Sequence, residues 1–183
     1  MLKTFRHHEI KKIAAYVKNG GVIIYPTDTV WGIGGSACDA AAVQKTKTLK
    51  GKPDNAKLIW LLPSVAAVEK FCGKVTDAER KMLSQKRTTV IIHGQAVRVV
   101  RSGWLSHLLF ACGVPLIATS ANKHGETVIK TWRQALQIFD GQDVAVVRGR
   151  KLKQVASSLV QFENTKEGPQ MKILRHGSGI SIN

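Results

Sequence analysis

Short β-rich runs alternate with helical patterns along the whole chain, and this interleaving restricts the fold more than any other feature of the sequence. Strands are expected at residues 22–25, 58–62, 88–92, 96–100, 115–118, 144–147, 158–162 and 172–174. Helices are expected at residues 7–18, 39–49, 64–71, 76–85, 102–112 and 131–139. The pattern predicts an α/β or mixed α+β fold. Because no repeat or linker interrupts it, we expect a single domain over residues 1–183.

Two polar segments are predicted to be loops. Residues 27–36 are rich in Thr, Asp and Gly and follow Pro26, which is expected to end the first strand. Residues 163–170 are also polar and are expected to form a mobile loop. The first loop contains a G-x-G-x-x-A match at Gly32, but five residues separate it from the strand. A dinucleotide-binding fold needs its glycines directly after the strand, so this match does not indicate one.

The charge balance points to an anionic partner. The chain has 28 Lys and Arg against 12 Asp and Glu, a net charge of +16, and its pI is near 10.1. Such an excess favours nucleic acid or nucleotides, and the alternative is a solvated basic surface with no specific partner. Apolar residues make up 44% of the chain, enough for a folded core.

Cysteines and hydrophobic runs indicate the compartment. Cys38, Cys72 and Cys112 are far apart, which excludes a C-x-x-C pair, so we expect reduced thiols buried as small hydrophobic residues. No metal-ligand spacing stands out among the histidines. The sequence has neither a signal-peptide core nor a run of 18 apolar residues, so a soluble cytoplasmic protein is expected.

Polar and cationic side chains at strand ends are the candidate binding residues. Thr27, Asp28 and Thr29 follow a strand and either line a pocket mouth or form a capped turn. Lys50 and Lys52 precede a proline and either grip a polyphosphate or lie in a solvated turn.

Two further segments carry groups that suit a small polar ligand. Arg98 alternates with valines in a predicted strand, where it either lies on a wet face or binds a carboxylate through both oxygens; Arg101 is a competing candidate on the other face. Ser120 and Asn122 are two residues apart in an extended segment and share one side, where they bind a ligand or make loop hydrogen bonds.

The order of these segments resembles the YrdC/TsaC (threonylcarbamoyl-AMP synthase) family. YPTDTVWGIG is similar to the family's YPT[DE]TVYGLG, and LKGKP is similar to its K-x-R-P. AVRV resembles the family's VxVRxP strand, and PLIATSAN matches its TSAN loop. ASSLVQF and ILRHG resemble the closing motifs, so the likeness covers roughly residues 10–180.

The resemblance implies a twisted mixed sheet with flanking helices around a deep basic cavity. It assigns threonine contacts to Thr27, Arg98, Ser120 and Ser157, and nucleotide contacts to Lys50, Lys52, Ser120, Asn122 and Arg175. Lys50, Lys52 and Arg98 would be the catalytic residues, and no metal ligand is implied. Lys52 departs from the family, which has Arg here, and Lys offers a point charge in place of a bidentate fork.

The resemblance also implies a reaction. L-Threonine, bicarbonate or CO2, and ATP would give threonylcarbamoyl-AMP and pyrophosphate, with Mg²⁺ accompanying the nucleotide. Partner proteins would then transfer the threonylcarbamoyl group to tRNA. An alternative is a YrdC-like module that binds tRNA or double-stranded RNA with weak or no synthase activity. A third is a carbamoyl-transfer relative that acts on another acceptor.

Overall fold

The computed structural model describes residues 2–123, 125–150, 152, 155–165 and 168–179. In this part of the chain ten strands form one mixed sheet, in the order β1-β8-β2-β3-β7-β4-β6-β5-β9-β10. The strands are β1 (Lys3–Arg6), β2 (Ile23–Pro26), β3 (Trp31–Gly34), β4 (Ile59–Leu62), β5 (Thr88–Ile92), β6 (Gln95–Val99), β7 (Leu116–Ser120), β8 (Ala145–Arg148), β9 (Ser158–Thr165) and β10 (Gly168–Arg175). The helices are α1 (Ile10–Lys18), α2 (Ala40–Lys50), α3 (Val65–Cys72), α4 (Asp77–Leu83), α5 (Gly103–Cys112) and α6 (Trp132–Ile138). The predicted mixed α/β class is confirmed.

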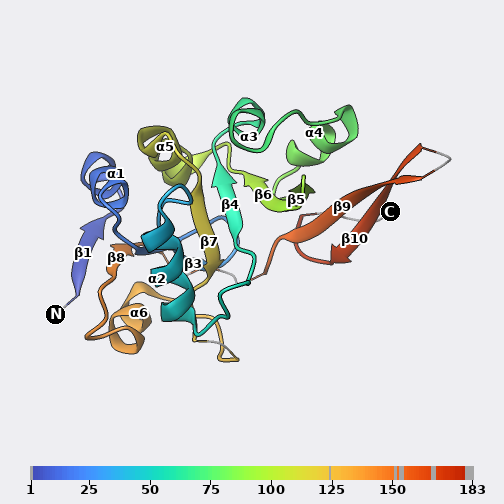
Figure 1. Ribbon diagram of the computed structural model, residues 1–183. Coiled ribbons are helices and arrows are strands. Elements are labelled where there is room, and N and C mark those ends of the chain that lie inside the picture. Colours follow the sequence, from blue (N-terminus) through green and yellow to red (C-terminus); the bar gives the residue numbers. More distant parts are fainter. Residues whose placement is uncertain (1, 124, 151, 153–154, 166–167, 180–183) are drawn as a thin grey trace.

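Helices cover both faces of the first half of the sheet. Ile23 and Tyr25 of β2 pack in one core with α1 and α5, and Ile24 packs in another with α2 and α6. Alternate side chains of a strand point to opposite faces, which explains the division. In Figure 1, α1 and α5 lie above this part of the sheet, α2 passes in front of the strands and α6 lies below them.

The second half of the sheet is covered differently. Val97 and Val99 of β6 pack in a third core with α3, α4 and β5. Ala96 and Arg98, which alternate with them, point to the opposite face of the sheet, where they line a cavity. The alternation therefore places the Arg98 side chain of β6 at the cavity.

The expectation of a loop over 27–36 is wrong for its second part. Residues 31–34 form β3, which is antiparallel to β2. Pro26 is the last residue of β2, where it pairs with Trp31 of β3. Glycine is unfavourable in strands, but here it permits close approach to β7. A Cβ on Gly34 would lie 2.1 Å from the Ile117 carbonyl oxygen.

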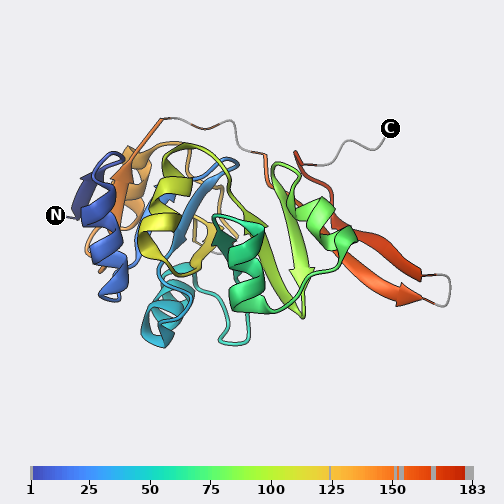
Figure 2. The same cartoon turned by 90° about the horizontal axis from the view of Figure 1, so that it is seen from above.

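The expectation of a mobile loop over 163–170 is also wrong. Its described residues continue β9 and begin β10, which pair antiparallel in a hairpin that projects from the molecule (Figures 1 and 2). Residues 166–167 lie outside the described part. A projecting two-stranded ribbon leaves most side chains exposed, so its strands carry polar residues that are typical of a loop.

Other expectations had mixed outcomes. The hairpin of β5 and β6 and the Asp39 cap of α2 are confirmed. Burial is confirmed for Cys112, whereas Cys72 is half-buried and Cys38 is exposed. No sequence signal predicted β1, in which only Phe5 is buried. None of the helices in the described ranges is long and apolar enough to cross a membrane.

Candidate ligand-binding cavity

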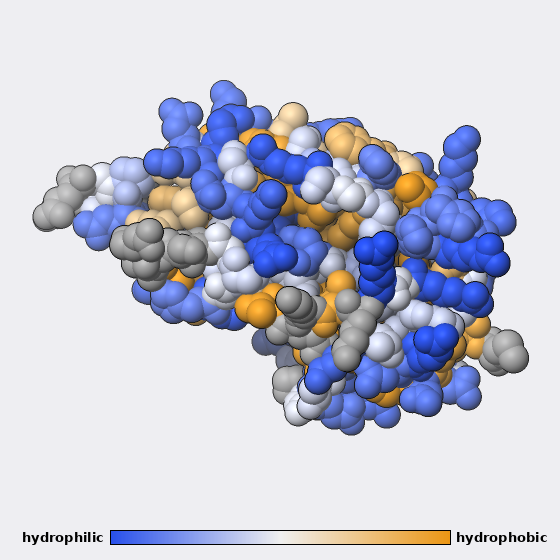
Figure 3. Space-filling view, turned by 180° about the vertical axis from the view of Figure 1, so that it is seen from behind, coloured by the Kyte–Doolittle hydropathy of each residue, from blue (hydrophilic) through white to orange (hydrophobic). Residues whose placement is uncertain are grey.

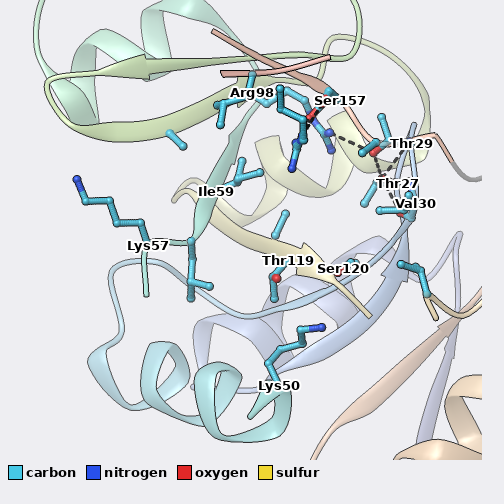
Figure 4. Close-up of a pocket in the computed structure, with 18 of the residues that line it drawn as sticks. Thr27, Thr29, Val30, Lys50, Lys57, Ile59, Arg98, Thr119, Ser120 and Ser157 are labelled. Atoms are coloured by element: carbon cyan, nitrogen blue, oxygen red, sulfur yellow. Dashed lines mark hydrogen bonds between the residues drawn. The ribbon is translucent and has the colours of Figure 1, made fainter. Parts of the chain in front are cut away.

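A cavity of about 610 Å³ opens beside the strands at the centre of the sheet. Its wall is built from the β2–β3 turn, the end of α2, and strands β4 to β7, β9 and β10 (Figure 4). The eight site residues that the family resemblance implies all line it: Thr27, Lys50, Lys52, Arg98, Ser120, Asn122, Ser157 and Arg175. Asp28, a further candidate for the pocket mouth, is not among the lining residues. Segments up to 148 residues apart in sequence therefore meet at one hollow.

The cavity is strongly cationic. Its lining includes Lys50, Lys52, Lys57, Arg98 and Arg175, and no Asp or Glu among the residues described. Cations that gather in a concave site with low-dielectric walls concentrate the positive field there. The arrangement suits a ligand with several negative charges. Hydrophilic side chains also dominate the outer face seen in Figure 3, in keeping with the net charge of +16.

The turn after β2 is held by the Thr27 hydroxyl. Thr27 Oγ1 accepts hydrogen bonds from the backbone N–H groups of Thr29, at 3.1 Å, and Val30, at 3.2 Å. It also donates to the Val30 carbonyl oxygen at 2.7 Å. These bonds fix the turn, and they place Thr29 Oγ1 where it accepts a hydrogen bond of 3.1 Å from Arg98.

Arg98 is a buried cation with an incomplete set of partners. Its exposed fraction is 4%, and its Nη2 lies 3.1 Å from Asp28 Oδ1. Its Nε is buried with no hydrogen-bond partner in the part of the chain that the structure describes. Arg101, the competing candidate, is exposed and donates to Ser84 outside the cavity. Arg98 is therefore the arginine of this strand region that can meet a ligand in the cavity.

Lys50 ends α2 on the other side of the cavity, with Thr119 and Ser120 between it and Arg98 in the view of Figure 4. Lys50 Nζ donates to the backbone oxygen of Asn122 and, at 2.7 Å, to its Oδ1. Asn122 is fixed in turn because its Nδ2 donates to the Glu126 carbonyl oxygen at 2.7 Å. Burial, and then the nearby Lys52 charge, lower the pKa of Lys50 to about 8.

Ser157 ties the β9–β10 hairpin to the cavity. Its Oγ lies 2.9 Å from Thr89 Oγ1 and accepts a hydrogen bond of 3.2 Å from Arg175 Nη2. Arg175 Nε donates to the Ser157 carbonyl oxygen at 3.1 Å. Burial, and then the charge of Arg98, lower the pKa of Arg175. The two guanidinium groups therefore share one region of the cavity.

Sequence reasoning missed Lys57, which lines the cavity next to the tip of the β5–β6 hairpin. Its Nζ donates to the Gly94 carbonyl oxygen at 3.1 Å. A lysine just before a strand carries no signal that separates it from a solvated one. Sequence reasoning also missed that the cavity has an apolar side; its residues are Leu58, Ile59, Ile91, Ala96 and Leu159.

No group of three or more His, Cys, Asp or Glu side chains is placed to hold a metal ion among the residues described. The cavity offers hydroxyl, amide and cationic groups instead.

Known proteins were compared with the sequence and the fold. The Sua5/YciO/YrdC family model, described as "Telomere recombination", matches residues 15–177. A threonylcarbamoyl-AMP synthase of Thiobacillus denitrificans is 30% identical over 158 residues, which cover 74% of this chain and 81% of that protein. The threonylcarbamoyl-AMP synthase of Methylobacillus flagellatus is 27% identical over 152 residues, 74% of this chain and 84% of that protein.

Solved structures share the fold. E. coli YciO superposes with a TM-score of 0.84 at 18% identity, covering 98% of both chains. P. abyssi Sua5 complexed with L-threonine superposes with a TM-score of 0.81 at 23% identity over 97% of this chain. This chain spans 57% of the length of that Sua5 chain. Both the family match and the fold confirm the resemblance seen in the motifs, and the chain belongs to the Sua5/YciO/YrdC family.

Proposed function

We propose that this chain is an L-threonylcarbamoyladenylate synthase. The observation that carries the proposal is a single cavity with a buried arginine, Arg98, on one side and the Lys50–Lys52 pair on another. Arg98 suits a carboxylate and the lysines suit a triphosphate, so a small amino acid and ATP can lie side by side. The family membership and the names of the relatives support the same reaction.

The reaction would proceed in two bond-forming steps. The threonine amine adds to CO2, derived from bicarbonate, and loses a proton to give a carbamate. A carbamate oxygen then attacks the α-phosphorus of ATP, and pyrophosphate leaves with the electrons of the broken P–O bond. The second step transfers a nucleotidyl group, which makes the enzyme a nucleotidyltransferase.

The residues would act by holding the two substrates in position and by neutralising negative charge on the phosphates. Arg98 would bind the threonine carboxylate, Thr27 would also contact the threonine, and Ser157 would complete that side. Lys50 and Lys52 would bind the phosphates and offset the negative charge that develops on them. A further set would contact the nucleotide or the junction between the substrates: Ser120, Asn122 and Arg175.

Mg²⁺ would enter as part of the substrate. The described lining has no carboxylate that could hold the ion, so ATP phosphate oxygens and water would be its ligands. The protein would work as one domain in the cytoplasm. Partner proteins would pass the threonylcarbamoyl group to the adenosine next to the tRNA anticodon.

The proposal is tested by product analysis. The protein is incubated with MgATP, labelled bicarbonate and L-threonine, and pyrophosphate and labelled threonylcarbamoyl-AMP are measured. We expect both products only when threonine is present. Pyrophosphate release that does not depend on threonine, or that other amines support equally well, would overturn the proposal; the second result would favour carbamoyl transfer to another acceptor.

A further inference from the structure

Two of the three guanidinium nitrogens of Arg98 have partners among the residues described, and the third has none. A guanidinium presents its N–H groups in a rigid plane that matches the two oxygens of one carboxylate. Here Nη1 donates to Thr29 Oγ1 and Nη2 lies 3.1 Å from Asp28 Oδ1. Nε, on the same guanidinium, is buried without a hydrogen-bond partner among the residues described. A buried donor left unpaired costs free energy, so the site suits an acceptor that the described residues do not supply.

Asp28 supplies the counter-charge for Arg98 in the structure. Arg98 and Arg175 lie close enough for the charge of Arg98 to lower the pKa of Arg175. Within the described chain, Asp28 is the carboxylate within ion-pair distance of Arg98. The side chain of Asp28 is 33% exposed whereas that of Arg98 is 5% exposed. Asp28 can therefore turn into water at small cost, while Arg98 has to keep a negatively charged partner.

We propose that Asp28 is an internal competitor for Arg98, displaced when a substrate carboxylate binds. The incoming carboxylate takes Nη2 from Asp28 with one oxygen and pairs with Nε through the other. This inference rests on the proposed function, which brings the threonine carboxylate to Arg98. It makes Asp28 a residue that sets the affinity for carboxylate ligands, because a ligand with no carboxylate leaves the Asp28–Arg98 pair in place and is not affected by it.

Calorimetric titration of two ligands into three proteins tests this inference. The ligands are L-threonine and L-threoninol, which lacks the carboxylate; the proteins are wild type, Asp28→Asn and Asp143→Asn. Asp143→Asn is the matched control, since it removes the same charge from an exposed ion pair with Lys45, away from the cavity. We expect Asp28→Asn to bind L-threonine about two- to fivefold more tightly, the scale of one partly exposed ion pair. The affinity for L-threoninol, and both affinities of the control, should stay unchanged.

Two outcomes would overturn the role of Asp28. One is L-threonine binding that weakens or stays unchanged in Asp28→Asn, which would make Asp28 a support for Arg98 or a bystander. The other is an equal gain for L-threoninol. The melting temperature of each variant shows whether it folds, and Asp28→Ser repeats the test with a side chain that cannot replace the carboxylate.

A separate measurement distinguishes this inference from the proposed function. If L-threonine binds to none of the proteins, the proposed function fails. The Nε–H signal of Arg98 in nitrogen–proton NMR, assigned by its loss in Arg98→Lys, still reports on the Asp28 pair. We expect that signal to broaden or exchange faster with water in Asp28→Asn than in Asp143→Asn. An unchanged signal would overturn the claim that Asp28 restrains Arg98.

Discussion

At the scale of single residues, the cavity holds charges that the protein only partly satisfies. Arg98 is buried and lacks a partner at Nε. Lys50 is also buried and donates to two oxygens of Asn122, a neutral residue. Taking a charge out of water is costly, and neutral acceptors return only part of that cost. An anionic ligand would therefore offset the free-energy cost of burying both charges.

Replacing Arg98 should separate the two substrates. Arg98→Ala removes the proposed carboxylate partner but leaves Lys50 and Lys52 in place, so we expect L-threonine affinity to fall about 100-fold, the scale of a broken buried charge pair. ATP affinity should fall far less. Arg98→Lys is the control that keeps the charge without the fork. An equal loss of both affinities by calorimetry would refute the assignment of Arg98 to threonine.

Lys50 gives the cavity a dependence on pH. Its pKa of about 8 means that the ammonium loses its proton as the pH rises through that value, and its attraction for phosphate is then lost. We expect ATP to bind more weakly at about pH 9.5 than at about pH 7.5, a range over which the phosphates keep their charge. Calorimetry checks this, with Lys50→Arg as the variant that stays cationic. A wild-type affinity that changes no more than that of Lys50→Arg would count against the prediction.

At the scale of elements, close backbone approach between β3 and β7 shapes the wall of the cavity. β3 lies antiparallel to β7, with Gly32 opposite Ser120. Gly34 leaves no room for a side chain beside Ile117. The register that results brings Ser120 and Asn122 to the same hollow as the Thr27 turn.

Substitution of Gly34 should therefore destabilise the fold. A Cβ there would lie 2.1 Å from a backbone oxygen, which cannot move without disturbing β7. We expect Gly34→Ala to cost about 3 kcal/mol of unfolding free energy, a magnitude found where core packing is broken. Gly141→Ala is the control: φ is +73° there but no atom is near, and about 1 kcal/mol is expected. Urea denaturation that shows equal costs would contradict this reading of the sheet.

Periodic segments could be predicted from the sequence, whereas elements fixed by tertiary contacts could not. The predicted helices exist because each has a face or cap that the pattern reveals, as with Asp39. β3 was missed because its glycines are placed by contact with β7, not by propensity. The hairpin strands were predicted only in part, at 158–162 and 172–174, because exposure makes the residues nearer the turn polar. Local sequence does not record which distant residue a strand will meet.

The candidate site shows the same limit. The motif order placed eight residues, and all of them line one cavity. Lys57 had no motif, and its position follows from the β4–β6 pairing that brings it near Gly94. The pairing of Asp28 with Arg98 joins residues far apart in sequence and depends on the whole sheet. The role of a residue could thus be predicted where the sequence carries a motif. The proposed competition of Asp28 with a substrate carboxylate could be inferred only from the fold.

At the scale of the whole molecule, the net charge of +16 acts beyond the cavity. Neutralising RNA phosphates releases counterions, so a basic protein binds RNA in a manner that weakens steeply with salt. We expect tRNA to bind in a gel-shift assay at about 50 mM salt and to dissociate by about 200 mM. Absence of binding at the lower salt would show that the charge is spread too thinly to hold RNA.

The fold as a whole gathers its ligand groups on the face of β5 and β6 that α3 and α4 leave open. On the proposed function, this one hollow would receive two substrates with different charges. Lys50 and Arg98 define its two sides, and the strand ends between them supply hydroxyl groups.

A crystal structure of the protein with L-threonine and a non-hydrolysable ATP analogue tests this account most directly. The account predicts both molecules in the one cavity, the threonine carboxylate on Arg98 with Asp28 turned away, and the phosphates on Lys50 and Lys52. Electron density for either molecule at another face of the protein, or a cavity that admits only one of them at a time, would contradict it.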